Sequence, residues 1–170
     1  DKENLTIVTV CSHSSLQIFH GAKKEGFKTL GITVGRPPKI YDAFPLAKPD
    51  EFLVLDRYEQ IFDHLDMLRE KNSIIIPHGS FVEYLGADRF KQLPIPTFGN
   101  RDVLEWESDR NMERKWLERA EIKMPKEVKD PKKIDQPVMV KYQGAKGGRG
   151  FFIAKDYNQF KLGIDHTQEF

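Results

Sequence analysis

The stretch LTIVTVCSHSSLQIFHGAKKEGFKTLGITV, residues 5–34, decides the fold of this chain. Its first run, LTIVTV, is rich in β-branched residues and predicts a strand. Apolar residues at helical spacing follow, with Ser14 or Ser15 as the expected N-cap and Gly26 as the expected stop. The last run, TLGITV, predicts a second strand. A strand, a helix and a strand in this order form the unit from which parallel sheets are built.

The alternation of strands and helices continues beyond this unit. Three further runs predict strands: EFLVL (51–55), SIIIP (73–77) and IPTFG (95–99). Residues 58–71 carry apolar side chains on one helical stripe, and a short helical segment is expected from Phe81 to Leu85. We therefore expect an α/β domain with an open, doubly wound parallel sheet over roughly residues 1–100.

After the fifth predicted strand the pattern changes. Residues 102–120 have a strongly helical pattern, and Pro125 lies just beyond it. PVMVKY (137–142) and GFFIA (150–154) predict the two strands of an antiparallel hairpin. A further helix is expected after Asp156, its predicted cap. A hairpin that follows a parallel sheet indicates the start of a second domain.

Composition and charge argue against several classes of protein. Lys and Arg number 27 and Asp and Glu 26, so the chain has no net positive field to hold a nucleic acid. Cys11 is the only cysteine, which rules out a disulfide framework within the chain and makes the cytoplasm the expected location. No apolar run approaches the roughly 20 residues that span a bilayer, so no membrane partner is expected.

The segment KYQGAKGGRGFF, residues 141–152, carries four glycines and three cations. It fits neither the Walker A pattern nor the Rossmann pattern. Glycine amides can approach an anion closely because no Cβ intervenes, and Lys141, Lys146 and Arg149 would add positive charge. The composition favours phosphate binding. The alternative is an exposed hairpin whose basic residues serve only solubility.

Two loops at the expected carboxyl ends of strands, residues 10–15 and 77–81, each carry a histidine beside serine or glycine. In an open parallel sheet, ligands bind in the crevice beyond these ends. Five residues are therefore expected to converge on one phosphorylated small molecule: His13, Ser14, Ser15, Gly79 and Ser80. The alternative is that the serines are simple helix caps and the histidines are exposed loop residues.

Patterns for a metal site or a nucleophile are weak. Cys11, His13 and His20 lack the spacing of a zinc site. Cys11 is expected to end a buried strand as a small hydrophobe, and not to act as a nucleophile with His13.

The order of these segments resembles the ATP-grasp superfamily, in which an α/β domain precedes an ATP-binding domain. The resemblance gives a role to five features: a helix opened by Asp109-Arg110, Pro125 before the next domain, the strand lysine Lys141, the glycine loop 144–150, and Gln168-Glu169-Phe170 at the start of a hinge. It implies a pre-ATP-grasp domain with its linker helix over 1–122. The start of an ATP-grasp domain, incomplete at its C-terminus, would occupy 123–170. Glu121 stands where these chains usually carry glycine, at a cost on the order of 1 kcal/mol if the position needs a positive φ.

Four blocks are similar, in order, to the archaeal 5-formaminoimidazole-4-carboxamide ribonucleotide synthetases, the PurP family. They are SHSSLQIFHGAKKEGF, IIIPHGSFVEYLG, FGNRDVLEWESDRNMERKWL and VKYQGAKGGRGFFIAK. The resemblance covers nearly all of the chain. It implies an ATP-dependent formate–amine ligase of purine (IMP) biosynthesis, which uses ATP, Mg²⁺ and formate to formylate AICAR to FAICAR through formyl phosphate.

The same resemblance assigns binding residues. His13 and Ser80 would contact AICAR. The residues expected to bind ATP are Arg110, Lys141, Gly144, Ala145, Lys146, Gly147, Gly148, Arg149, Gly150 and Glu169. No catalytic residue is assigned, and the Mg²⁺ ligands are expected in a C-terminal portion outside this chain. The expected partners are the small-molecule substrates and further copies of the chain, as a trimer or hexamer.

Two alternatives stay open. A relative that keeps the ATP-grasp architecture without synthetase activity would act as a nucleotide sensor or an assembly partner. A different ATP-grasp carboxylate–amine ligase would keep the ATP chemistry and change only the substrate.

Overall fold

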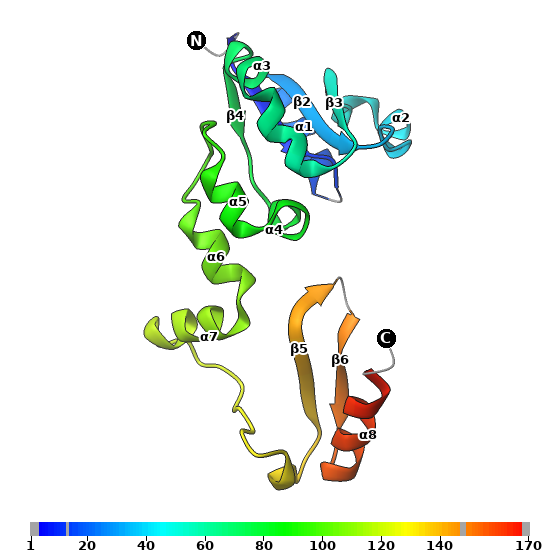
Figure 1. Cartoon of the computed structure of the whole chain (residues 1–170), viewed down its shortest axis with the longest axis vertical. Helices are drawn as coiled ribbons and strands as arrows, with labels where there is room; N and C mark the ends of the chain where they lie inside the picture. The colour runs from blue at the N-terminus through cyan, green and yellow to red at the C-terminus, as the bar shows by residue number, and fades with distance from the viewer. Residues whose placement is uncertain (1–3, 13, 147–148, 168–170) are drawn as a thin grey trace. The chain divides into compact units, whose positions relative to one another are not determined.

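The computed structural model describes residues 4–12, 14–146 and 149–167. Contacts between Cα atoms divide the chain into two compact units, Asp1–Glu105 and Trp106–Phe170 (Figure 1). The expected domain boundary between residues 122 and 123 stays a prediction.

A parallel sheet forms the centre of the first unit. Within the described residues its strand order is β3-β2-β1-β4. The strands are β1 (Thr6–Val10), β2 (Lys28–Val34), β3 (Glu51–Leu55) and β4 (Ser73–Ile75). Thr6 of β1 pairs with Lys28 on one side and with Ser73 on the other, so β1 is a central strand. These strands confirm four of the five predicted runs.

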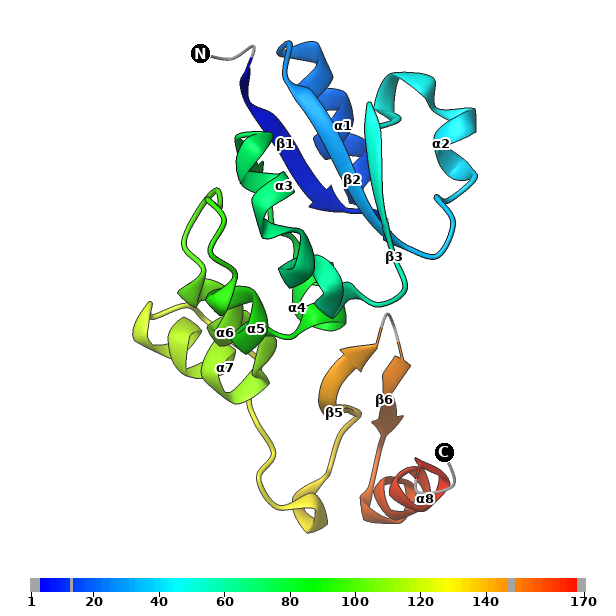
Figure 2. The same ribbon diagram turned by 45° about the horizontal axis from the view of Figure 1, so that its top comes forward.

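Helices cover both faces of this sheet, as Figure 2 shows for α1 and α3. The helical elements of the first unit are α1 (Ser15–Lys24), α2 (Ile40–Ala43), η2 (Pro45–Ala47), η3 (Tyr58–His64), α3 (Leu65–Glu70), α4 (Gly79–Leu85), α5 (Ala87–Gln92) and the start of α6 (Asp102–Ser108). Gly26 follows α1 with φ +83°, which confirms it as the stop of that helix. The doubly wound arrangement is therefore confirmed.

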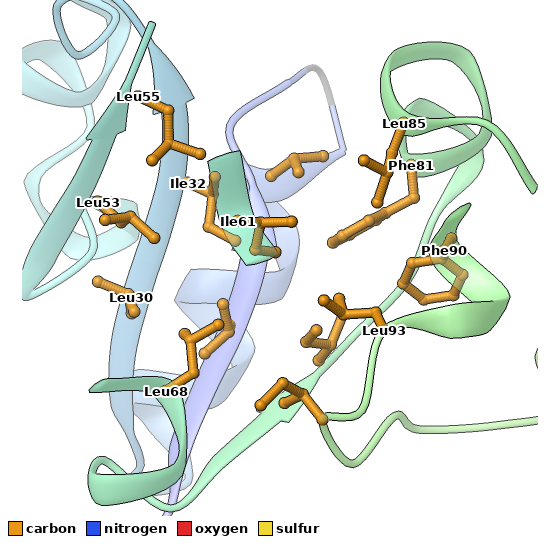
Figure 3. Packing of buried hydrophobic residues seen from close by; sticks show 14 of the residues in the cluster. Leu30, Ile32, Leu53, Leu55, Ile61, Leu68, Phe81, Leu85, Phe90 and Leu93 are labelled. Atoms are coloured by element: carbon orange, nitrogen blue, oxygen red, sulfur yellow. The ribbon is translucent and has the colours of Figure 1, made fainter. Parts of the chain in front are cut away.

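The two faces of the sheet have different cores because successive side chains of a strand point to opposite sides. Val8, Val10 and their neighbours on β2 and β3 belong to the large apolar cluster with η3, α3, α4 and α5. Figure 3 shows Phe81, Leu85, Phe90 and the strand residues converging in this cluster. On the other face a smaller cluster joins Cys11, Phe19 of α1 and Tyr41 of α2.

The predicted strand at residues 95–99 is wrong as a strand. The segment does lie beside β4, since Ile75 donates to the carbonyl of Pro96 and accepts from the N–H of Phe98, both at 2.8 Å. The pairing stays an isolated bridge between Ile75 and Thr97. Proline has no N–H to donate, so Pro94 and Pro96 limit how far a ladder can extend here.

The predicted helix at 58–71 exists as two elements, a 3₁₀ segment η3 and the α-helix α3. In η3 a hydrogen bond runs from the N–H of Gln60 to the carbonyl of Arg57, three residues back. Apolar periodicity over so short a stretch does not separate the two kinds of helix, because both place Ile61 and Leu68 on the buried side.

The single helix predicted at 102–120 is also wrong, because the structure breaks it at Asp109 into α6 and α7 (Arg110–Arg119). The Asp109 carboxylate accepts from the N–H groups of Asn111 at 2.7 Å and Met112 at 3.0 Å, so it is the N-cap of α7. The Arg119 guanidinium lies 5.5 Å from the centre of the Trp106 ring. In one straight helix, Trp106 and Arg119 would lie about 20 Å apart along the axis. Their contact therefore requires the chain to turn between α6 and α7.

The second unit contains an antiparallel hairpin and a helix that packs on it. Its further elements are η4 (Pro131–Lys133), β5 (Val138–Lys146), β6 (Arg149–Ala154) and α8 (Tyr157–Thr167). Phe152 of β6 lies 6.3 Å from Phe160 of α8, measured between ring centres. Asp156 accepts from the N–H of Gln159 at 2.9 Å and caps α8 as predicted. Among the described helices, none is long and apolar enough to cross a bilayer.

Candidate functional site

The order of strands in the sheet points to the place where a ligand would bind. From β1 the chain adds β2 and then β3 on one side, while β4 lies on the other side of β1. Ligands of open α/β sheets bind at such a reversal, beyond the carboxyl ends of the strands. Here the reversal lies between β1 and β4, and the segments that follow these two strands are the loops at 10–15 and 77–81.

Two hydrogen bonds join these two loops, and a third orders the second loop. The Ser80 hydroxyl donates to the Ser12 hydroxyl at 2.8 Å. His78 Nδ1 accepts from the N–H of Ser80 at 3.3 Å, so the ring proton lies on Nε2, which donates to the Val10 carbonyl at 3.2 Å. Residues 68 positions apart in sequence thus meet at the edge of the sheet. Of the five residues predicted to converge, the structure brings Ser80 to the first loop, where its partner is Ser12, and the convergence of the five on a ligand stays a prediction.

Ser15, one of the five residues expected around a phosphorylated ligand, lies instead in the core. Its side chain is fully buried. Its hydroxyl donates to the Ser12 carbonyl at 2.5 Å and lies 2.6 Å from the Tyr41 hydroxyl. Ser14 stands at the N-cap of α1 without a hydrogen bond from its side chain to the helix. His13 lies outside the described residues.

Sequence reasoning missed Ser12 and the role of His78. Ser12 lies two residues beyond the end of β1, in the loop already singled out, and its hydroxyl at that place was the available signal. His78 was noticed as part of its loop, but its contact with the Val10 carbonyl depends on the pairing of β1 with β4 and has no local signature.

Arg110, expected to bind ATP, is the first residue of α7. The resemblance placed the helix start at Asp109-Arg110, and this is confirmed. The Arg110 Nε atom is buried and has no hydrogen-bond partner among the described residues. A buried guanidinium nitrogen without an acceptor fits a site for an anion.

Lys141 lies on β5, is exposed, and pairs across the hairpin with Phe151. The next ladder pair is Lys146 with Arg149. Between these pairs β5 has residues 142–145 and β6 has only Gly150, so the register shifts and β5 bulges. Such a bulge takes backbone groups out of the ladder.

The glycine segment is therefore more regular than predicted. Gly144, Ala145 and Lys146 belong to β5, while Arg149 and Gly150 belong to β6. The prediction of a loop over this whole segment is wrong, because glycine is permissive and does not prevent strand pairing. Gly147, Gly148 and Glu169 lie outside the described residues.

Cys11 has the structural role that was predicted. It is buried, and burial raises the pKa of its thiol to about 11. The thiol is protonated near neutral pH and is a poor nucleophile. Among the described residues, no group of three or more His, Cys, Asp or Glu side chains could hold a metal ion.

Comparisons with known proteins agree with this arrangement. Residues 7–128 match the family described as "Protein of unknown function (DUF1246)". The 5-formaminoimidazole-4-carboxamide-1-(beta)-D-ribofuranosyl 5'-monophosphate synthetase of Methanosarcina acetivorans is 64% identical over 170 residues, which is 100% of this chain and 48% of that protein. The chain spans about half of the length of the curated relatives that it matches.

Two solved structures are similar in fold. The IMP biosynthesis protein PurP from Thermococcus kodakaraensis matches with a TM-score of 0.64 and 31% identity, over 86% of this chain and 48% of that one. An N5-carboxyaminoimidazole synthetase from Staphylococcus aureus, complexed with ADP, matches with a TM-score of 0.64 and 18% identity, over 94% of this chain and 43% of that one. The predicted fold class, a doubly wound sheet followed by part of an ATP-grasp domain, is confirmed.

Proposed function

The chain belongs to the DUF1246 family, and from this premise we propose that it serves an ATP- and formate-dependent ligase that converts AICAR to FAICAR. The first unit would hold AICAR and the second unit ATP. The observation that carries the proposal is the bond between the Ser80 and Ser12 hydroxyls, which ties two loops together at the reversal of the sheet. AICAR, a ribonucleotide, has the phosphate and hydroxyl groups that such a polar edge would bind.

The proposed chemistry explains why a phosphate-binding unit is needed. Formate is a poor electrophile, so ATP would first transfer a phosphoryl group to it, giving formyl phosphate and ADP. The amine of AICAR would then attack the formyl carbon, with loss of phosphate and a proton. Phosphoryl transfer depends on positioning and on neutralising charge, and requires little covalent help from the protein.

Features of the second unit support ATP binding. The buried Nε of Arg110 lacks an acceptor among the described residues, and Lys141 offers an exposed cation on β5. The β5 bulge at 142–145 would turn backbone N–H groups toward an anion. Mg²⁺ would neutralise the phosphates of ATP. The described residues do not form a complete site for it, and its ligands are proposed to lie outside this chain.

Incubating the full-length protein with ATP, Mg²⁺, AICAR and formate tests the proposal. We expect ADP and FAICAR to form in equal amounts, and neither to form when formate is omitted. ADP without FAICAR would mean that the acceptor is another amine. Binding of ATP without any turnover would favour the non-catalytic relative and contradict the ligase.

The remaining parts of the proposal concern location and assembly. A cytoplasmic location rests on the lone cysteine and the small-molecule substrates. Assembly into a trimer or hexamer rests on resemblance, and light scattering of the full-length protein would measure it.

A further inference from the structure

Tyr41 is a buried polar residue that the proposed function does not use. It lies on the four-residue helix α2, in the segment that links β2 to β3, and its side chain is 2% exposed. Its ring makes edge contacts with Phe19 at 6.1 Å and Phe52 at 5.5 Å, measured between ring centres. These contacts would be equally available to phenylalanine, so packing alone does not explain the hydroxyl.

The Tyr41 hydroxyl completes the hydrogen bonding of Ser15. A serine hydroxyl has one proton to donate and two lone pairs that accept. The Ser15 proton goes to the Ser12 carbonyl at 2.5 Å, and one lone pair accepts from the N–H of Ser12 at 3.1 Å. The remaining lone pair faces the Tyr41 hydroxyl at 2.6 Å, which makes Tyr41 the donor. Burial raises the pKa of Tyr41 above its ordinary value, so the hydroxyl stays protonated.

This arrangement fixes the backbone of Ser12. Its carbonyl accepts from both the hydroxyl and the N–H of Ser15, and its own N–H donates to the same hydroxyl. The Ser12 side chain in turn accepts from Ser80 of the second loop. A continuous path of hydrogen bonds therefore runs from Tyr41, on the segment between β2 and β3, to the edge where AICAR would bind.

We propose that Tyr41 is a positioning residue, which holds the loop after β1 in the geometry that binds AICAR by donating a hydrogen bond to Ser15. The proposal rests on the proposed function for the identity of the ligand. Without this bond, Ser15 retains its two contacts with Ser12 but loses the partner that fixes its position relative to the core. The loop would then sample other positions, and Ser12 and Ser80 would separate.

The test compares Tyr41→Phe with wild type in the full-length protein, with Ser73→Ala as the matched control. Ser73 is also buried and also carries a hydroxyl, but it lies at the amino end of β4, and its hydroxyl has no hydrogen-bond partner among the described residues. The measurements are the affinities for AICAR and ATP, the KM and kcat values, and the hydrogen exchange of the backbone N–H groups of residues 10–16 without ligand.

For Tyr41→Phe we expect faster exchange in residues 10–16 and an affinity for AICAR about tenfold lower, the usual effect of losing one buried hydrogen bond. The KM for AICAR rises, while kcat and the affinity for ATP stay as in wild type. Ser73→Ala changes none of these. Ser15→Ala should reproduce the effect of Tyr41→Phe, and it serves as the test if that variant does not fold.

The outcomes separate this proposal from the proposed function. If wild type binds AICAR and the variants bind it equally well, the positioning role is wrong and the proposed function stands. A weaker affinity for AICAR together with an equal loss for ATP would mean a general loss of structure and would overturn the positioning role. If wild type itself does not bind AICAR, the proposed function is wrong and the proposal falls with it.

Discussion

At the scale of single residues, Glu121 shows a cost that the sequence made predictable. It has φ 55°, in the left-handed region, and it follows α7 directly after the C-cap residue Ala120. The N–H of Ile122 reaches the Leu117 carbonyl at 3.1 Å and the N–H of Glu121 reaches the Glu118 carbonyl at 3.0 Å. This is the helix ending in which glycine is usual. Glu121, which stands where glycine is usual, therefore has a strained backbone in this structure.

Replacing this residue by glycine should stabilise the protein. Glu121→Gly relieves the left-handed strain but adds freedom to the unfolded chain, so we expect a gain of about 0.5–1 kcal/mol in the free energy of unfolding. Urea denaturation measures it. As a control, Lys115→Gly in the middle of α7 should lower that free energy by about 1 kcal/mol. A loss of stability in Glu121→Gly would contradict the strain.

Asp50 gives a second prediction at this scale. Its carboxylate accepts from the Thr29 N–H at 2.9 Å and hydroxyl at 2.8 Å, and lies 3.1 Å from Lys23 Nζ. Burial raises the pKa of the Asp50 carboxyl. The hydrogen bonds from Thr29 and Lys23, together with the charge of Lys23, lower this pKa by more, so it lies below its ordinary value. A carboxylate with a lowered folded pKa contributes stability above its unfolded pKa, and the contribution is lost as the pH falls through the folded pKa.

We therefore expect the stability difference between wild type and Asp50→Asn to depend on pH. It should be about 0.5–1 kcal/mol above pH ~5, since the group is partly exposed and screened, and should shrink toward zero near pH ~2. Denaturation curves across this range measure it. Asp66→Asn, at an exposed carboxylate paired with Arg69, is the comparison. A difference that stays constant from pH ~7 to ~2 would exclude this account of Asp50.

At the scale of elements, the sequence predicted most of the fold because the apolar patterns are local. The runs at 5–10, 29–34, 51–55 and 73–77 form the parallel sheet, and the hairpin and its helix were placed correctly. The break at Asp109 was missed by periodicity, since α6 and α7 follow each other within one helical pattern. A helix cap depends on one residue, so the apolar pattern did not reveal it. The resemblance to ATP-grasp chains did place the start of a helix at Asp109-Arg110.

The parts of the site that escaped prediction depend on contacts between distant segments. Ser12 meets Ser80 only because β1 pairs with β4, and Ser15 meets Tyr41 only because α1 and α2 share the smaller core. The β5 bulge also escaped, because a glycine-rich composition does not determine how far a strand pair extends. Residue types pointed to the loops, and tertiary structure decided which hydroxyls face each other.

The cap of α7 carries the prediction at this scale. Asp109→Ala removes the acceptor for two N–H groups at the start of the helix, and we expect the free energy of unfolding to fall by about 1 kcal/mol. Asp109→Ser keeps a capping oxygen and should retain most of the stability. Thermal unfolding of both variants measures the difference. Equal stability in Asp109→Ala and wild type would mean that the cap does not stabilise α7.

At the scale of the whole molecule, the two groups of candidate residues lie in different units. Ser12, His78 and Ser80 belong to Asp1–Glu105, while Arg110 and Lys141 belong to Trp106–Phe170. Each unit has its own packing, the first around the sheet and the second between the hairpin and α8. Binding of the two substrates should therefore be separable by mutation.

Lys141→Ala and Ser80→Ala test this separation in the full-length protein. Lys141→Ala removes a cation proposed to contact ATP, so we expect affinity for ATP to fall about tenfold or more, formylation to be lost, and affinity for AICAR to be kept. Ser80→Ala removes the hydroxyl bond to Ser12, so affinity for AICAR should fall about tenfold while affinity for ATP is kept. Calorimetry with each ligand measures both effects.

Two controls make the separation decisive. Lys155→Ala removes an exposed cation beyond the end of β6 and should leave both affinities unchanged. Thr97→Ser keeps a hydroxyl in the segment beside β4, outside both proposed sites, and should also change neither. If Lys141→Ala leaves ATP affinity and turnover intact, its assignment to ATP is wrong. If Lys141→Ala or Ser80→Ala lowers the affinities for ATP and AICAR equally, the two units do not divide the substrates between them.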